Sequence, residues 1–353
     1  MKIPTSNASA PGHGALRHLV PLTIVLAALS GPVSAQTNIT LDNTAYQYFA
    51  VDTVRHFLYA GESNGPGGTK RLNVINTLTN TIVGTYNFTA SGYSSQIAAS
   101  GTNVFWADQG SNLLRVIAVN GSGVPSLTRS DAATQATGVA ALSTTYAVSK
   151  QGGGDFMSIR QISSGTELFN VNLGGVAGQV YADANTNLYY ARSTSDTKVI
   201  NTSGTIVGTL SNKLVMAIDS SASNNFIYIQ DGGTPFVLSQ LAGANQAATG
   251  NTFNFAAAYG GVAVNDMNGD VFVSQQALNR VVHLSSSLAF IQYLSVPNAG
   301  ALAIIDAQLY VHQAGSTTLS VLAIPEPGTW AVLSGSAALC FAVWRRRAGV
   351  RPA

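Results

Sequence analysis

The amino-acid sequence predicts an all-β fold, a seven-bladed β-propeller, flanked by an apolar segment at each end of the chain. Three observations support this prediction. A short apolar strand, a turn and a strand with a central aromatic residue recur seven times. β-Branched and aromatic residues alternate with Gly, Asn and Ser turns, and helical periodicity is nearly absent from the repeats. A β-helix would need shorter repeats, and a β-sandwich would not keep one period for seven cycles.

The period of the repeat is measured from the central aromatic residue of each second strand. Successive aromatic residues are separated by 46, 41, 43, 39, 44 and 38 positions. The mean of about 42 residues is typical of a four-stranded propeller blade. The seven aligned residues are Tyr59, Phe105, Tyr146, Tyr189, Tyr228, Phe272 and Tyr310.

The two ends of the repeat region predict how the ring closes. The seventh repeat stops at Pro325 before its outer strand, whereas Asn38–Leu41 reads as a strand without a repeat of its own. A ring must cover its last edge, because an open strand edge promotes aggregation. We therefore expect a propeller domain over residues 36–324, with the N-terminal strand completing the last blade.

Residues 1–35 have the order of a secretory signal peptide. Lys2 and Arg17 precede the apolar run Leu19–Leu29, and small residues end at Ala35. The apolar run is too short for a permanent membrane span. We expect cleavage between Ala35 and Gln36 and export of the remaining chain.

The last 29 residues, 325–353, contain three successive features. Pro325, Glu326 and Pro327 end the repeats, because proline continues neither a strand nor a helix. An uncharged run of about the minimum length for a transmembrane helix reaches Trp344. The arginine cluster Arg345, Arg346 and Arg347 then predicts a cytoplasmic end. An ordinary single-pass anchor is the alternative.

The order of Pro325-Glu326-Pro327, apolar helix and arginine cluster resembles the PEP-CTERM sorting signal. The resemblance covers only these C-terminal residues. It implies recognition by an exosortase, a transient inner-membrane anchor, and final placement at the cell surface or in the extracellular matrix. The family is tied to Gram-negative bacteria that make exopolysaccharide.

The propeller repeats are similar to the YVTN and NHL-like families. The similarity is strongest at Asn73–Thr85 and Gly261–Val273, and it is loose elsewhere.

Charge and cysteine content restrict the classes of partner. Six of the 17 basic residues lie in the two end segments, which leaves 11 basic against 14 acidic residues between them. A mildly acidic body without a basic stripe argues against nucleic-acid binding. The single cysteine, Cys340, lies in the C-terminal apolar run, so the propeller has no disulfide or cysteine metal ligand.

The position three residues after each aligned aromatic predicts a ring of side chains at one mouth of the channel. Three carboxylates and one guanidinium in this ring are candidate ligands for a polar molecule, for calcium or for another divalent cation. Alternatively, the acidic residues hold the following turn through hydrogen bonds to its backbone. The ring comprises Glu62, Asp108, Ser149, Arg192, Asp231, Gln275 and Gln313, with His312 beside it.

Two aromatic residues, Trp106 and Tyr93, are expected near the channel mouth, where they would stack on sugar rings. The sequence contains no His-x-His, no His-Glu-x-x-His and no recognisable catalytic set, and no cofactor is expected. Residues 266–270 are explained by an Asn-Gly turn better than by a calcium loop.

Three functions remain open on these grounds. The first is a non-catalytic binding or matrix protein that contacts extracellular polysaccharide or a surface protein. The second is a lactonase-like propeller hydrolase or lyase that uses a metal held by Glu62, Asp108 and Asp231. The third is a purely structural role in the cell envelope.

Overall fold

The computed structural model describes residues 36–62, 68–89, 92–151, 155–219, 221, 224–231 and 236–324. Residues Gln36–Ala323 form one compact unit. The predicted signal peptide, sorting motif, membrane-spanning segment and arginine cluster lie outside the described residues. Within the described ranges, no helix is both long and apolar enough to cross a membrane.

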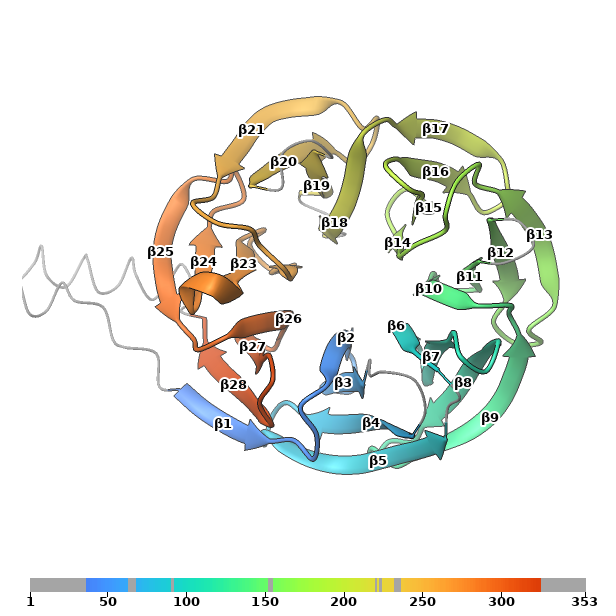
Figure 1. The fold of residues 1–353 in the computed structure, drawn as a ribbon, viewed down its shortest axis with the longest axis horizontal. Helices are drawn as coiled ribbons and strands as arrows, with labels where there is room; N and C mark the ends of the chain where they lie inside the picture. Colours follow the sequence, from blue (N-terminus) through green and yellow to red (C-terminus); the bar gives the residue numbers. More distant parts are fainter. Residues whose placement is uncertain are drawn as a thin grey trace, which may run out of the picture. The chain divides into compact units, whose positions relative to one another are not determined.

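Seven four-stranded antiparallel sheets are arranged around a central opening, which confirms the seven-bladed propeller (Figure 1). In blades 1 to 6 the strands follow one another from the innermost to the outermost. Blade 1 has β2 (Tyr46–Asp52), β3 (Phe57–Glu62), β4 (Thr69–Asn76) and β5 (Thr81–Thr89). Blade 2 has β6 (Ser94–Ser100), β7 (Asn103–Asp108), β8 (Leu113–Val119) and β9 (Pro125–Ala132). Blade 3 has β10 (Ala136–Ala141), β11 (Thr145–Lys150), β12 (Phe156–Gln161) and β13 (Glu167–Asn172).

The remaining blades continue the same order. Blade 4 has β14 (Val180–Asp183), β15 (Leu188–Arg192), β16 (Thr197–Asn201) and β17 (Ile206–Leu210). Blade 5 has β18 (Lys213–Asp219), β19 (Phe226–Asp231), β20 (Val237–Ala242) and β21 (Ala248–Asn254). Blade 6 has β22 (Val262–Val264), β23 (Val271–Gln275), the 3-10 helix η1 (Gln276–Leu278), β24 (Arg280–Leu284) and β25 (Phe290–Ser295).

Blade 7 joins the two ends of the described chain. It contains β26 (Ala299–Ile305), β27 (Gln308–Gln313) and β28 (Thr318–Ala323), and β1 (Gln36–Thr40) is its outermost strand. β1 pairs antiparallel with β28, from Gln36 opposite Leu322 to Thr40 opposite Thr318. This pairing is the closure that the unmatched N-terminal strand predicts, because it covers the edge of β28.

The aligned aromatic residues form the core between the blades. All seven are at most 1% exposed. Phe105 of blade 2, for example, stacks on Tyr146 of blade 3 with ring centroids 4.7 Å apart. One blade alone cannot bury both faces of its sheet, so each aromatic residue is covered by the neighbouring blade. The sequence therefore repeats because the same packing between blades recurs around the ring.

Two faces of the disc are distinguished by their loops. The η1 face carries η1 and the connections that follow the second strand of each blade. The Asx-turn face carries the turns between the first and second strands. In four of these turns an Asp or Asn side chain accepts a backbone N–H two residues on, which holds the turn. The pairs are Asp52 with Val54 (3.1 Å), Asp183 with Asn185 (2.9 Å), Asp219 with Ser221 (2.9 Å) and Asn265 with Met267 (3.0 Å).

Candidate functional site

The structure places two carboxylates of the predicted ring inside the protein. Asp108 is fully buried and receives hydrogen bonds from the Arg115 Nε (2.9 Å) and from the backbone N–H of Ser111 (3.1 Å). Its Oδ2 also lies 2.8 Å from the Arg115 Nη2. Asp108 therefore holds the following turn, which is the alternative that the sequence left open for these acidic residues.

Glu62 is also fully buried. Burial raises the pKa of Glu62, while hydrogen bonds from the Arg71 backbone and the Asn43 side chain act in the opposite direction. Ser149 and Gln275 of the ring are buried as well, whereas Gln313 is half-buried. The seven ring residues therefore occupy equivalent positions in the repeats, but they do not form a continuous accessible surface.

The prediction that Trp106 lies on an accessible surface is wrong. Its side chain is 0% exposed and packs edge-on against Phe88, with ring centroids 4.8 Å apart. Trp106 follows the aligned aromatic Phe105, so its side chain lies on the opposite side of β7. In a propeller both sides of the second strand are covered by neighbouring blades. Tyr93 does reach the surface and is 54% exposed.

His312 is buried too, although it was expected beside the mouth. It is 2% exposed, its Nε2 lies 3.0 Å from the Ser316 carbonyl oxygen, and its ring meets Tyr46 edge-on. Burial lowers the pKa of His312, with the contact to Ser316 opposing the shift. The side chain is therefore neutral near pH 7 and supports the packing of blade 7.

Besides Gln313, the ring residues that remain partly accessible are Arg192 and Asp231, both half-buried on the η1 face. The Arg192 Nη1 donates to the Gln179 Oε1, which also accepts the Tyr181 hydroxyl at 3.1 Å. Burial raises the pKa of Tyr181, the Arg192 charge lowers it, and Tyr48 of blade 1 contributes a small increase.

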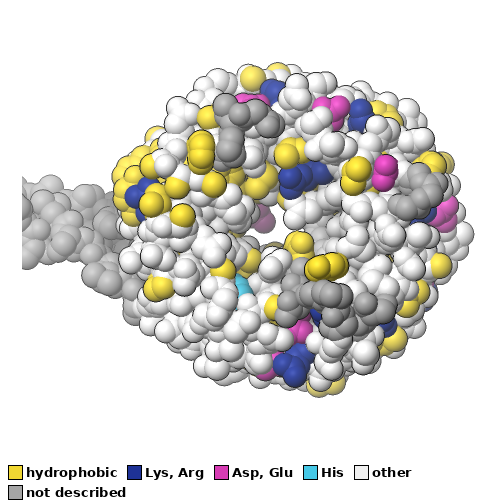
Figure 2. All heavy atoms as spheres, in the orientation of Figure 1, with side chains coloured by type: hydrophobic (Ala, Val, Ile, Leu, Met, Phe, Trp, Pro, Cys, Tyr) yellow, Lys and Arg dark blue, Asp and Glu magenta, His cyan; other side chains and the backbone are white. Residues whose placement is uncertain are grey.

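Lys213 is the functional candidate that the sequence pattern missed. It begins β18, and its carbonyl oxygen accepts a hydrogen bond of 2.8 Å from the Thr197 hydroxyl. Thr197 pairs with Arg192, and Lys213 pairs with Asp231. The two cations therefore lie on neighbouring blades at the same end of the channel. Figure 2, which views the η1 face, shows basic side chains at the edge of the central opening.

The charges around this pair are not fully compensated. Of the seven arginines among the described residues, five form ion pairs with carboxylates, and Arg192 and Arg280 form none. Lys213 also forms no ion pair within the described ranges. Tyr259 lies nearby: burial raises the pKa of its hydroxyl, the charge of Asp231 adds to the increase, and the charge of Arg192 opposes it. We define the mouth cluster as Gln179, Tyr181, Arg192, Lys213 and Tyr259.

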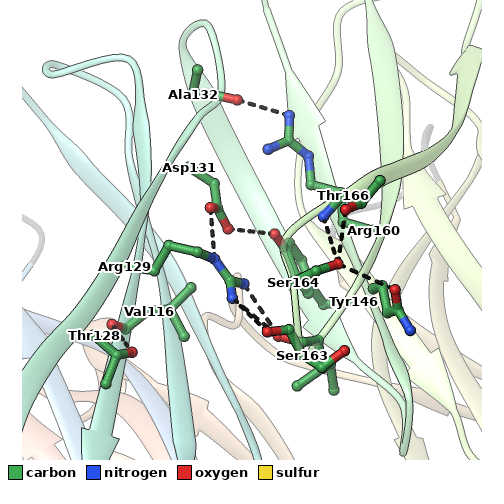
Figure 3. A network of polar contacts seen from close by, with 12 residues as sticks. Val116, Thr128, Arg129, Asp131, Ala132, Tyr146, Arg160, Ser163, Ser164 and Thr166 are labelled. Atoms are coloured by element: carbon green, nitrogen blue, oxygen red, sulfur yellow. Dashed lines mark hydrogen bonds and ion pairs between the residues drawn. The ribbon is translucent and has the colours of Figure 1, made fainter.

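A second concave feature lies between blades 2 and 3, where Figure 3 shows the polar contacts of Arg129. It has a volume of about 430 Å³ and is lined by Asn103, Val116, Thr128, Arg129, Ile162, Ser163 and Ser164.

The guanidinium of Arg129 is fully engaged in this groove. It donates to Asp131 at 2.7 Å and to the carbonyl oxygens of Ile162 at 3.2 Å and Ser163 at 3.4 Å. The Tyr146 hydroxyl donates to the other Asp131 oxygen at 2.6 Å. We refer to Arg129, Asp131 and Tyr146 as the blade 2–3 staple. Because every one of these groups already has a protein partner, the staple is structural.

A metal centre with three or more protein side-chain ligands is not formed in the described part of the chain. No three His, Cys, Asp or Glu side chains there lie close enough to share a metal ion. The trio Glu62, Asp108 and Asp231, proposed for a metal-dependent hydrolase or lyase, is therefore not brought together.

Comparison with known proteins shows the fold and no more. No family model matches the chain, and no curated protein matches it in sequence. The chain is similar in structure to hydrazine synthase of Kuenenia stuttgartiensis, with a TM-score of 0.60, 9% identity, and coverage of 81% of this chain and 97% of that one. It is also similar to the β-propeller domain of Cps50 (Swd1) from Myceliophteria thermophila, with a TM-score of 0.63, 10% identity, and coverage of 82% and 100%. At such low identity these matches establish a β-propeller and carry no function across.

Proposed function

We propose that this chain is an exported, non-catalytic binding protein whose mouth cluster holds an acidic polysaccharide at the cell surface or in the extracellular matrix. One observation carries the proposal. Arg192 and Lys213 lie on neighbouring blades at one end of the channel without a carboxylate ion-pair partner among the described residues, and Gln179, Tyr181 and Tyr259 lie near Arg192.

The chemistry of these side chains suits a uronic acid. A guanidinium has five N–H donors in a planar fork that matches a carboxylate, and Gln179 occupies only one of those of Arg192. Lys213 adds a flexible point charge. Tyr181 and Tyr259 are half-buried, and their hydroxyls are held by Gln179 and by the Val237 carbonyl oxygen, so their contribution to a sugar is the ring edge or face that remains accessible. Asp231 on the same edge disfavours ligands of very high negative charge density, such as nucleic acid.

The binding site is tested with a soluble polyuronate and, as a neutral control, dextran. We expect the purified full chain to bind the polyuronate at low ionic strength and to lose affinity as salt is added. Loss of one charge-assisted hydrogen bond is worth about 1.5–3 kcal/mol, so Arg192→Gln should weaken binding by about 10- to 100-fold.

The matched control is Arg280→Gln. Arg280 also lacks a carboxylate partner, but it stacks over the Tyr293 ring at 3.8 Å instead of lining the mouth cluster. This variant should bind as the wild type does. Undiminished binding by Arg192→Gln and Lys213→Gln, or equal retention on dextran, would refute the assignment of the site.

The proposed location rests on the two ends of the sequence. The export signal at residues 1–35 and the order Pro325-Glu326-Pro327, apolar run, arginine cluster support sorting by an exosortase from a transient inner-membrane anchor. Replacement of Pro325–Pro327 by alanines should retain the chain in the inner-membrane fraction of a host that has an exosortase. The same distribution between membrane and extracellular fractions in wild type and variant would contradict sorting by this motif.

A further inference from the structure

We propose a second site at the opposite end of the channel, a binding site for a hard divalent cation such as calcium, held by Asp219 of blade 5 and Asp266 of blade 6. This site goes beyond the polysaccharide proposal and does not depend on it. Asp219 ends β18, the strand that Lys213 begins. The two ends of this strand are separated by about 20 Å at ~3.3 Å per residue.

The repeated Asx turns provide an internal comparison. In blade 1 the second oxygen of Asp52 pairs with the Arg55 Nε at 2.5 Å. In blade 4 the second oxygen of Asp183 accepts the Thr186 Oγ1 at 2.7 Å. Blade 6 has the neutral Asn265 at the equivalent position. Each of these turns therefore either satisfies its second oxygen or carries no charge.

Asp219 of blade 5 is the exception. Its Oδ1 accepts the backbone N–H of Ser221 at 2.9 Å, whereas its Oδ2 is buried without a hydrogen-bond partner. The whole residue is 0% exposed. An ionised oxygen that is removed from water without a partner costs several kcal/mol, so such a group is normally paired or bound to a metal. The buried Oδ2 of Asp219 would therefore be stabilised by a bound cation.

The turn of blade 6 brings a second carboxylate to this place. Phe226, which pairs with Asp219, packs in the same cluster as Val264. The β18–β19 and β22–β23 turns also touch, because a Cβ on Gly269 would collide with the Asn224 side chain. Asp266 lies in the β22–β23 turn, two residues after Val264.

The like charges of the two carboxylates oppose each other. Asp266 is exposed at the turn; partial burial of its carboxyl and the charge of Asp219 raise the pKa of Asp266 to about 6. No Lys, Arg or His ion pair is formed by either carboxylate within the described ranges. A divalent cation between the two carboxylates would remove their repulsion.

The ligand set favours calcium over transition metals. Calcium takes six to eight oxygen ligands and accepts irregular geometry, whereas zinc prefers nitrogen and sulfur ligands. Two carboxylates leave several positions for water, so we expect a weak site of about 10⁻⁴–10⁻³ M, the range of extracellular modules.

The site is tested by thermal unfolding of the purified full chain after treatment with a chelator. Calcium is added to 10 mM at constant ionic strength, with sodium chloride as the reference. For a dissociation constant near 0.5 mM the midpoint should rise by about 4 °C. Asp219→Asn and Asp266→Asn should abolish the rise. Asp183→Asn, which alters an equivalent turn with a satisfied carboxylate, should keep it.

Two results would overturn the proposal. One is a wild-type midpoint that calcium does not change, and the other is a full calcium response in both Asp219→Asn and Asp266→Asn. If Asp219→Asn does not fold, calorimetric titration of calcium into wild type and Asp266→Asn decides the question. Heat of binding that is equal in these two proteins would exclude the site. Binding of polyuronate at the mouth cluster is measured separately and does not enter this outcome.

Discussion

Replacement of Gly165 by alanine should break the blade 2–3 staple although none of the three staple residues is replaced. Gly165 follows the turn of blade 3 that faces Arg129, with a backbone φ of +74°. A Cβ at this position would lie 2.6 Å from the Arg129 Nε and 2.7 Å from the Asp131 Oδ1. Both atoms belong to the ion pair itself, so the pair must separate or the turn must move.

The magnitude follows from two contributions. A non-glycine residue in the left-handed region costs about 1–2 kcal/mol. Loss of the charge-assisted hydrogen bond between Arg129 and Asp131, whose side chains are 24% and 8% exposed, adds about 1.5–3 kcal/mol. We therefore expect a loss of about 2.5–5 kcal/mol in the free energy of unfolding. In a domain of this size the midpoint of thermal unfolding should fall by about 8 °C.

Two other glycines separate the contributions. Gly174 has a φ of +70° with no atom within 4 Å of its would-be Cβ, so Gly174→Ala should cost only the backbone contribution. Gly121 has neither a positive φ nor a nearby atom, and Gly121→Ala should change stability by less than about 1 kcal/mol. Unfolding in urea measures all three variants. Equal losses for Gly165→Ala and Gly174→Ala would show that the staple contributes nothing.

Three further predictions concern the core and the closure. Tyr146→Phe removes the hydroxyl that donates to Asp131, so the free energy of unfolding in urea should fall by about 1.5–3 kcal/mol. Tyr189→Phe removes a hydroxyl that lies 2.8 Å from the hydroxyl of a neutral threonine, and this variant should lose less. A larger loss in Tyr189→Phe than in Tyr146→Phe would contradict this account. Ile39→Asp places a charge where a side chain only 6% exposed packs against blade 7, so the midpoint should fall and light scattering on heating should rise. Burial lowers the pKa of His312, so the unfolded chain binds the proton more tightly; stability is full above about pH 6.5 and is lost as the pH falls towards the folded pKa. His312→Asn should flatten this loss between pH 7.5 and 5, and an unchanged slope would exclude His312 as its source.

The polysaccharide and calcium proposals place different chemistry at the two ends of one strand. Lys213 at the start of β18 belongs to a cationic edge, and Asp219 at its end belongs to an acidic one. An innermost strand of a propeller crosses the disc from face to face, so each inner strand exposes its two ends to different surroundings. Variants at one end should therefore leave binding at the other end unchanged.

The sequence alone determined the architecture, because the periodic signal is strong. The aligned aromatic residues, from Tyr59 to Tyr310, set the number of blades, and an unmatched strand before Leu41 predicted how the ring closes. These features follow from a local requirement that each sheet be covered on both sides. That requirement repeats at every blade, and it is therefore visible without tertiary information.

Only the tertiary structure decided which of the aligned polar residues face solvent. Glu62, Asp108 and Arg192 occupy the same position in their repeats, yet the first two are buried and the third is half-exposed. Exposure depends on the loops and partners that each neighbouring blade supplies, such as Arg115 beside Asp108. Likewise, the Asp219 Oδ2 lacks a hydrogen-bond partner because of the particular residues that surround the β18–β19 turn. A repeat fixes the backbone at every copy, but the surroundings of a side chain come from residues distant in sequence.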